Sequence, residues 1–221
     1  MSKESIVFVV DDDDCICEAV TDLLAPLSLS VITFNSVAEY MAFDRPQRTA
    51  CLILDVRLPD DTGLNLQARL ADTDHPPIIF ITGHGDVESS VRAIKAGAVD
   101  FLTKPFGRRE LLRAVMTALD VDEKARIRRT ERARLLSCFS TLTPREREVL
   151  PLVASGLLNK QAAALLGISQ VTLQIHRGQV MRKMAAKSLA QLVRMADMLG
   201  ICSPLPPSDE DRVADGPGIR A

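Results

Sequence analysis

Five short runs of β-branched and other apolar residues divide the first half of the chain, and the stretches between them are long enough for helices. The runs are residues 6–10, 31–34, 51–54, 78–81 and 101–102. Strands that alternate with helix-length segments predict an α/β fold with a doubly wound, mostly parallel, five-stranded sheet. Ligands of such sheets bind in the crevice outside the carboxyl ends of the strands. The polar residues that follow each run are therefore the first candidates for a functional site.

Acidic residues directly follow the first and third of these runs. Residues 11–14 are four consecutive Asp, and Asp55 follows the third run. Because neighbouring carboxylates repel each other, a group of them at one sheet edge requires a divalent cation, and oxygen-only ligands favour Mg²⁺. After the fourth and fifth runs, Thr82 adds a hydroxyl and Lys104 a cation. A carboxylate nucleophile, a metal, a hydroxyl and a cation are the groups that phosphoryl chemistry needs.

The charge of the chain changes sign near residue 120. Residues 1–120 hold 11 Lys and Arg against 19 Asp and Glu, whereas residues 121–202 hold 14 against 6. The basic part fits a polyanion such as DNA, because side chains that neutralise phosphates release counterions. The chain has no Trp and only 4% aromatic residues, which disfavours binding of single strands by base stacking.

Neither a membrane span nor a metal-binding cysteine cluster is evident in the sequence. No apolar run approaches about 20 residues, and residues 1–10 do not resemble a signal peptide, so we expect a cytoplasmic protein. The five cysteines are scattered and lack zinc-site spacing. We interpret them as reduced side chains that fill the core.

Helix-start and helix-stop residues recur in the basic part. The segment 143–146 (TPRE) combines a capping box with Pro at the first helical position. Further start and stop signals are Ser155-Gly156, Asn159, Gly167, Ser169, and Ser188 with Gln191. They predict four short helices. We expect the domain of residues 1–120, a helical Arg-rich linker at 121–140, an all-α domain at 141–202 and a disordered tail at 203–221.

Residues 5–120 resemble the receiver domain of two-component response regulators. The matching motifs are VVDDDD at 9–14, LILDVRLPDDTG at 52–63 and FITGHGDVESSVRAIKAGAVDFLTKPF at 80–106. The resemblance implies a flavodoxin-like fold in which a sensor histidine kinase phosphorylates Asp55. The implied Mg²⁺ ligands are Asp11, Asp12, Asp55 and the backbone carbonyl of Arg57. Thr82 and Lys104 are implied to bind the phosphoryl oxygens, and Phe101 to turn inward as Thr82 moves.

The four consecutive Asp leave more than one choice of metal ligands. The apolar run ends at Val10, so Asp11 and Asp12 come first at the carboxyl edge of the strand. We expect Asp13 and Asp14 to cap the next helix or to face solvent.

Enzymes on a similar fold are the main alternative for the acidic half. A phosphatase of the haloacid class also uses an Asp at a strand end, but it needs a second acid two residues later, where this chain has Arg57. Further catalytic acids and a substrate domain are absent from the sequence. We therefore predict that the chain is not an enzyme beyond Mg²⁺-dependent phosphotransfer and slow autodephosphorylation. Arg57 and His84 flank the site and are expected to influence the phosphoryl lifetime.

Residues 142–198 resemble the LuxR-type helix-turn-helix domain of the NarL/FixJ class of response regulators. The matching stretches are LTPREREVL, ASGLLNKQAAALLGISQVTLQIHRGQVMRKM and SLAQLVRMA. The resemblance implies that a helix at 169–184 enters the major groove of double-stranded DNA. The alternative for this segment is a small helical interaction module.

Spacing within the implied recognition helix separates its core side chains from its outward side chains. Leu173, Val180 and Met184 share one face and are expected in the core. Gln174 and Ile175 are candidates for reading base edges, since Gln can pair with adenine and Ile can contact a thymine methyl group. The candidates for contact with DNA phosphates are Lys160, Arg177, Arg182 and Lys183. Gly178 also faces outward, in place of a side chain able to contact DNA.

These features predict a transcription regulator switched by phosphorylation of Asp55. We expect phosphorylation to drive homodimerisation, which pairs two DNA-binding domains. RNA polymerase is a further expected partner. The alternative is a DNA-binding regulator that acts without phosphorylation and uses its receiver as a protein-interaction module.

Overall fold

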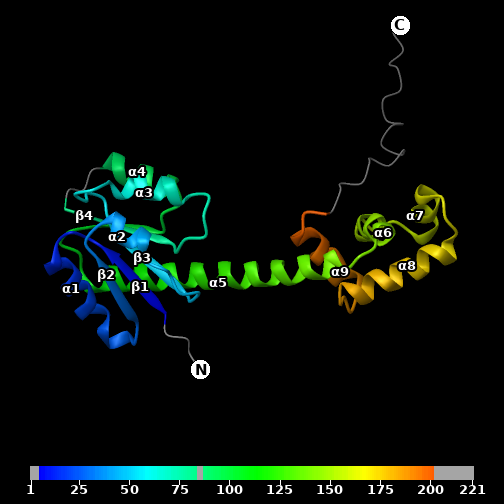
Figure 1. The fold of residues 1–221 in the computed structure, drawn as a ribbon, viewed down its shortest axis with the longest axis horizontal. Coiled ribbons are helices and arrows are strands. Elements are labelled where there is room, and N and C mark those ends of the chain that lie inside the picture. Colours follow the sequence, from blue (N-terminus) through cyan, green and yellow to red (C-terminus); the bar gives the residue numbers. More distant parts are fainter. Residues whose placement is uncertain (1–4, 84–86, 202–221) are drawn as a thin grey trace, which may run out of the picture. The chain divides into compact units, whose positions relative to one another are not determined.

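The computed structural model describes residues 5–83 and 87–201. The chain divides into two compact units, Met1–Ile127 and Arg128–Ala221. Helix α5, Arg108–Ser140, contributes residues to both units (Figure 1). The predictions made for His84, Cys202 and the tail at 203–221 concern residues outside the described part of the chain.

A five-stranded sheet forms the centre of the first unit. Its strands are β1 Ile6–Val10, β2 Ser30–Phe34, β3 Ala50–Asp55, β4 Ile78–Thr82 and β5 Asp100–Thr103. They pair in the order β2-β1-β3-β4-β5, and every pairing is parallel. Every residue of β1, β3 and β4 is buried, as expected for a parallel sheet that helices cover on both faces. The predicted fold class is therefore confirmed.

Helices cover the two faces of the sheet in separate layers. The helices before α5 are α1 Asp14–Leu24, α2 Val37–Ala42, α3 Gly63–Leu70 and α4 Val87–Lys95, and the short 3₁₀ segment Ala25–Leu27 follows α1. One core joins the sheet to α2, α3 and α4, and includes Phe8, Tyr40 and Leu66. The other joins the opposite face to α1 and α5, and includes Val9 and Val115. Figure 1 shows α3 and α4 together on one side of the strands.

The second unit is a group of short helices around one core. They are α6 Pro144–Ala154, α7 Asn159–Leu166, α8 Gln170–Lys183 and α9 Leu189–Met198. Leu135 near the end of α5 joins this core together with Val149, Leu173 and Val180. The four helices expected from the sequence are present, and Leu173 and Val180 are buried as expected.

Helix ends in the second unit mostly follow the residues that mark them in the sequence. The Thr143 hydroxyl accepts a hydrogen bond from the Glu146 N–H at 3.3 Å, and Glu146 Oε2 accepts one from the Thr143 N–H at 2.7 Å. These two bonds form the predicted capping box at the start of α6. Gly167 ends α7 with a φ of 64°, and Ser169 caps α8 through the Thr172 N–H.

The expectation that Asn159 caps a helix is wrong by one position. Leu158 is the N-cap of α7, and its N–H donates to Gln161 Oε1 at 2.9 Å. Asn159 is the first helical residue, and its side-chain oxygen accepts a hydrogen bond from Arg177 Nη1 at 3.0 Å. A partner on α8 thus takes the oxygen that a local cap would have used.

None of the helices in the described part of the chain combines the length and the apolar character that a membrane span requires.

Candidate functional site

Three carboxylates meet at the carboxyl edge of the sheet. Val10 pairs with Leu54 in the parallel register of β1 and β3, so the next residues, Asp11 and Asp55, emerge side by side. One side-chain oxygen from each of Asp11, Asp12 and Asp55 lies within 4.8 Å of the others. Asp11 is fully buried and Asp55 is 7% exposed, whereas Asp12 faces solvent. The structure thus brings together the three carboxylates that the sequence nominated as metal ligands.

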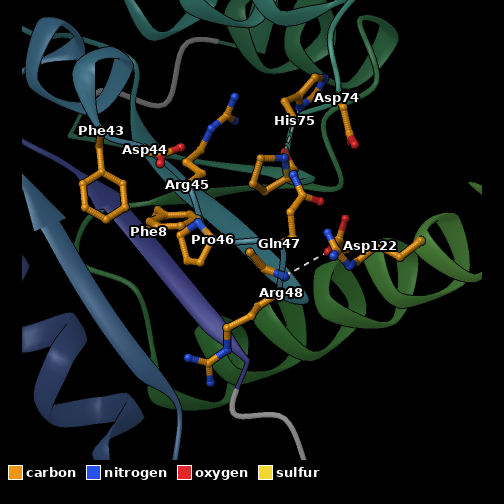
Figure 2. Close-up of a pocket in the computed structure, with 13 residues that line it drawn as sticks. Phe8, Phe43, Asp44, Arg45, Pro46, Gln47, Arg48, Asp74, His75 and Asp122 are labelled. Carbon is orange, nitrogen blue, oxygen red and sulfur yellow. Dashed lines mark hydrogen bonds between the residues drawn. The ribbon is translucent and has the colours of Figure 1, made fainter. Parts of the chain in front are cut away.

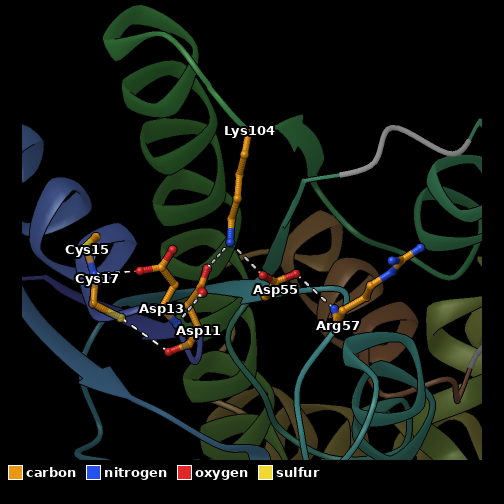
Figure 3. A network of polar contacts seen from close by, with 7 residues as sticks. All are labelled: Asp11, Asp13, Cys15, Cys17, Asp55, Arg57 and Lys104. Carbon is orange, nitrogen blue, oxygen red and sulfur yellow. Dashed lines mark hydrogen bonds and ion pairs between the residues drawn. The ribbon is translucent and has the colours of Figure 1, made fainter.

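Lys104 joins two of these carboxylates. Its Nζ lies 2.5 Å from Asp11 Oδ2 and 2.7 Å from Asp55 Oδ2 (Figure 3). It follows β5, and its backbone N–H donates to the Thr82 carbonyl at 2.7 Å, which ties it to the end of β4. The peptide bond between Lys104 and Pro105 is cis. One ammonium group therefore sits against a cluster of three carboxylates.

Backbone N–H groups bind the second oxygen of each of these two carboxylates, the one that Lys104 does not contact. The Asp13 N–H donates to Asp11 Oδ1 at 3.0 Å, and the Arg57 N–H donates to Asp55 Oδ1 at 3.0 Å. Asp13 also caps α1 by accepting a hydrogen bond from the Cys15 N–H, as expected for an acid outside the metal ligands. Asp11 and Asp55 therefore have fixed orientations before any ion or phosphoryl group arrives.

Burial and ion pairing act in opposite directions on the pKa values of Asp11 and Lys104. It raises the pKa of the Asp11 carboxyl, and the hydrogen bond from Lys104 offsets only part of this effect. Burial alone would lower the pKa of Lys104, but the hydrogen bonds and charges of Asp11 and Asp55 together raise it above its ordinary value. Burial also raises the pKa of the nearby Cys17 thiol to about 11. Cys17 is therefore a neutral core side chain, as interpreted from the sequence, whereas the same interpretation is wrong for Cys15, which is exposed.

The donor set of the cluster fits a hard divalent cation. All three side chains offer carboxylate oxygens, and the exposed Asp12 leaves an opening to solvent through which retained waters could complete the coordination. The side chain of Arg57 is exposed, and its backbone lies in the loop between β3 and α3, next to Asp55.

Thr82 and Phe101 lie on the strands next to this cluster. Thr82 is the last residue of β4 and is buried. Phe101 on β5 is half-buried, and its ring centroid lies 6.2 Å from that of Phe80. In the parallel register of β4 and β5, Thr82 pairs with Thr103 and Phe80 pairs with Phe101.

Gly63 is a site residue that the reasoning from the sequence did not single out. A Cβ atom at this position would collide with the backbone carbonyl of Asp55 and would lie 3.0 Å from the side chains of Leu54 and Phe80. Its N–H donates to the Val56 carbonyl at 3.0 Å. Only Gly permits this close approach of two backbone segments. The signal in the sequence that could have found it is the Gly eight residues after the strand-end Asp.

A hollow in the first unit lies at the amino ends of the strands, opposite the sheet edge that carries the acidic cluster (Figure 2). Its volume is about 270 Å³. Asp122 of α5 accepts a hydrogen bond there from the Ala50 N–H at 2.9 Å, which holds α5 to the start of β3. The ionisable lining residues are Asp44, Arg45, Arg48, Asp74, His75, Asp122 and Arg126. Because acidic and basic groups are nearly balanced, this hollow favours neither an anion nor a cation.

In the second unit, the side chains nominated as base readers lie on the outward face of α8. Gln174, Ile175 and Gly178 are exposed. Arg182 is exposed as well, and so is Lys160 on α7. All five are therefore accessible to a ligand of this unit.

Two other residues nominated for DNA contact already have partners inside the unit. Arg177 donates to Asn159 of α7. Lys183 Nζ lies 2.6 Å from Glu146 Oε2 and also donates to the Thr141 carbonyl at 3.2 Å. These bonds hold α8 against α7 and against the start of α6, which orients the helix that carries the exposed residues.

Comparison with known proteins agrees with both parts of the chain. Residues 7–116 match the family model of the response regulator receiver domain, and residues 140–196 match that of bacterial regulatory proteins, luxR family. Nodulation protein W of Bradyrhizobium diazoefficiens is 51% identical over 90% of this chain and 88% of its own length. The transcriptional regulatory protein FixJ of Azorhizobium caulinodans is 39% identical over 91% of this chain and 96% of its own.

A solved structure extends the similarity to the fold. The response regulator StyR superposes with a TM-score of 0.75 at 42% identity, over 88% of this chain and 99% of that chain. In this chain the match to the receiver family precedes the match to the luxR family. The chain therefore belongs to the response regulators that join a receiver domain to a LuxR-type DNA-binding domain.

Proposed function

We propose that Asp55 accepts a phosphoryl group from a sensor histidine kinase and that this modification controls DNA binding. The observation that carries the proposal is the carboxylate of Asp55, fixed between the Arg57 N–H and the Lys104 ammonium group beside two further carboxylates. An oriented carboxylate with an adjacent cation suits nucleophilic attack on a phosphorus atom. Two matched domains, one of each kind, connect this chemistry to DNA.

In this proposal, the residues around Asp55 bind the metal and the phosphoryl group. Asp11, Asp12, Asp55 and the backbone carbonyl of Arg57 would hold Mg²⁺, which when bound offsets negative charge on the phosphoryl oxygens. Lys104 and Thr82 bind the phosphoryl oxygens. When a phosphoryl group arrives, the ammonium group of Lys104 exchanges part of its contact with Asp55 for contact with that group. No activity beyond phosphotransfer and slow autodephosphorylation is proposed.

The surface formed by α4, β5 and α5 is the proposed contact between two copies of the phosphorylated chain. Val91 and Ile94 on α4 and Met116 on α5 are exposed apolar side chains of the first unit. Movement of Thr82 toward the phosphoryl group would free space for Phe101 to turn inward from β5, which changes this surface. Two paired chains would present two DNA-binding domains to a two-fold site, with RNA polymerase as a further partner.

The domain limits complete the proposal. The receiver spans residues 1–120, a helical linker 121–140, the DNA-binding domain 141–202 and a tail 203–221. The proposed DNA contacts are Lys160, Gln174, Ile175, Arg177, Gly178, Arg182 and Lys183. Among them, Gln174 and Ile175 read base edges, whereas the four Lys and Arg side chains meet phosphates. We place the protein in the cytoplasm, where its proposed partner DNA lies.

Intact-mass measurement tests the proposal directly. The full chain is incubated with Mg²⁺ and a small acyl phosphate, and wild type is compared with Asp55→Asn and with Asp22→Asn, a control acid exposed on α1. We expect wild type and Asp22→Asn to gain one phosphoryl group, and Asp55→Asn to gain none. Phosphorylated chains should form dimers in sedimentation and bind duplex DNA more tightly. Equal DNA binding before and after phosphorylation would contradict the switch.

A further inference from the structure

The outward face of α8 carries two large apolar side chains. Val171 and Ile175 expose 69% and 60% of their surface. With Gly178 they recur at spacings of four and three residues, which places them on one face of the helix. Leu173 and Val180 are fully buried on the opposite face. Since neither apolar side chain is needed for the core, both are available to a ligand that binds this face of α8.

The basic side chains of α8 begin only after this apolar pair. Residues 170–176 contain no Lys or Arg. Arg177 and Lys183 are hydrogen-bonded to residues of α7 and α6, and Arg182 Nη2 donates to Gln179 Oε1 at 2.6 Å. The first two turns of α8 therefore offer apolar and amide groups in place of cations.

Each base pair presents different chemistry to such a surface. Guanine offers two acceptors, which Arg or Lys commonly reads, whereas thymine offers a methyl group and adenine pairs with the amide of Gln. Gly178 adds no side chain, and a Cβ atom built there would meet nothing within 4 Å. The helix backbone can therefore approach the floor of the groove closely next to Ile175.

We infer that Val171 and Ile175 contact thymine methyl groups and that the first two turns of α8 select A·T base pairs in the major groove. Val171 is thereby assigned as a residue that determines sequence specificity. The exposed amide of Gln174, on the flank of the apolar pair, reads adenine in the same segment. The inference rests on the proposed DNA binding and deepens it by naming the base pairs that the domain reads.

Selection from a random duplex library provides the first test. The full chain, phosphorylated with a small acyl phosphate, is used to enrich binding sites. We expect each enriched half-site to contain A·T pairs in the segment that α8 contacts. Thymines in the enriched site are then replaced one at a time by deoxyuridine, which removes only the methyl group. Loss of one buried methyl contact should weaken wild-type binding by about fourfold.

Two variants assign the methyl contact to a residue. Val171→Ser removes the apolar side chain at an exposed position with little change in helix propensity. It should bind about equally to thymine and deoxyuridine at one position of the site. The control is Leu165→Ser, which removes an equally exposed apolar side chain from α7 and should retain the wild-type response at that position.

The outcomes separate this inference from the function on which it rests. Enriched sites with G·C pairs in this segment, or equal deoxyuridine penalties in wild type and Val171→Ser, would overturn the inference and leave DNA binding intact. If no duplex is enriched from the library, with or without phosphorylation, the proposed function itself fails.

Discussion

Replacing Asp11 with Asn should stabilise the receiver unit when no divalent metal is present. The change removes the charge of a fully buried carboxylate and keeps an oxygen that can accept the hydrogen bond from the Asp13 N–H. Lys104 keeps its ion pair with Asp55. The variant therefore removes one charge of the cluster together with the hydrogen bond that Asp11 Oδ2 accepts from Lys104.

The charges around Asp11 nearly balance, so desolvation decides the sign of the effect. At an effective dielectric constant of about 20, a unit charge at the 4.8 Å limit of the cluster repels Asp11 by about 3.5 kcal/mol. Asp12 and Asp55 together therefore oppose it by about 7 kcal/mol before solvent screens the exposed Asp12, while Lys104 at 2.5 Å attracts it by a similar amount. The cost of burying the carboxylate remains, and it is also what raises the pKa of Asp11. We expect a gain of about 1–2 kcal/mol in the free energy of unfolding.

Urea unfolding followed by circular dichroism measures this difference, with EDTA in one series and Mg²⁺ in another. Mg²⁺ at 100 times its dissociation constant should stabilise wild type by about 2.7 kcal/mol and the variant by much less. Asp14→Asn serves as the control, because Asp14 is exposed and lies outside the cluster. If Asp11→Asn is less stable than wild type in EDTA, attraction by Lys104 outweighs desolvation and the reasoning is refuted.

Changes at three further positions test other parts of the structure by the same unfolding measurement. Gly63→Ala should destabilise the receiver unit by about 1–3 kcal/mol, because its Cβ would collide with the Asp55 carbonyl; an unchanged midpoint would show that the loop can move aside. Gly178→Ala should stabilise the second unit by about 0.5–1 kcal/mol, since the new methyl group meets no atom; a loss would reveal a contact not seen here. Glu146→Ala should cost about 1–3 kcal/mol by removing both the capping bond and the ion pair with Lys183, and Glu146→Gln should cost less because the cap is kept. The hydrogen bond from Lys183 lowers the pKa of the Glu146 carboxyl below 4.5. The stabilisation that the Glu146 charge provides is therefore present above pH 4.5 and should fade as the pH falls below that value. A difference in stability between wild type and Glu146→Gln that does not shrink in acid would contradict this.

Much of the receiver could be predicted because its signals are local. The apolar runs that became β1, β3 and β4 needed no knowledge of distant contacts, since strands buried on both faces are continuously apolar. The end of the first run at Val10 also placed Asp11 and Asp12 first at the sheet edge, and the parallel register brings them to Asp55. The rule that ligands bind at the carboxyl ends of parallel strands was enough to select these residues.

Contacts between residues distant in the sequence could not be predicted in this way. Asn is a residue type that favours N-cap positions, yet the side-chain oxygen of Asn159 binds Arg177, which lies 18 residues later. Lys183 was nominated for DNA contact by its charge, but it pairs with Glu146, 37 residues earlier. The requirement for Gly at position 63 likewise depends on how closely the loop packs against Asp55.

The sequence by itself determined the succession of strands and helices along the chain, the two domain types and the acidic residues of the site. Each of these follows from a local pattern of apolar, acidic or capping residues. Only the tertiary structure decided which cations are already paired, how one ammonium group is shared between Asp11 and Asp55, and which apolar side chains of α8 remain exposed. These properties depend on distances between elements, and side-chain charge or hydrophobicity alone does not specify them.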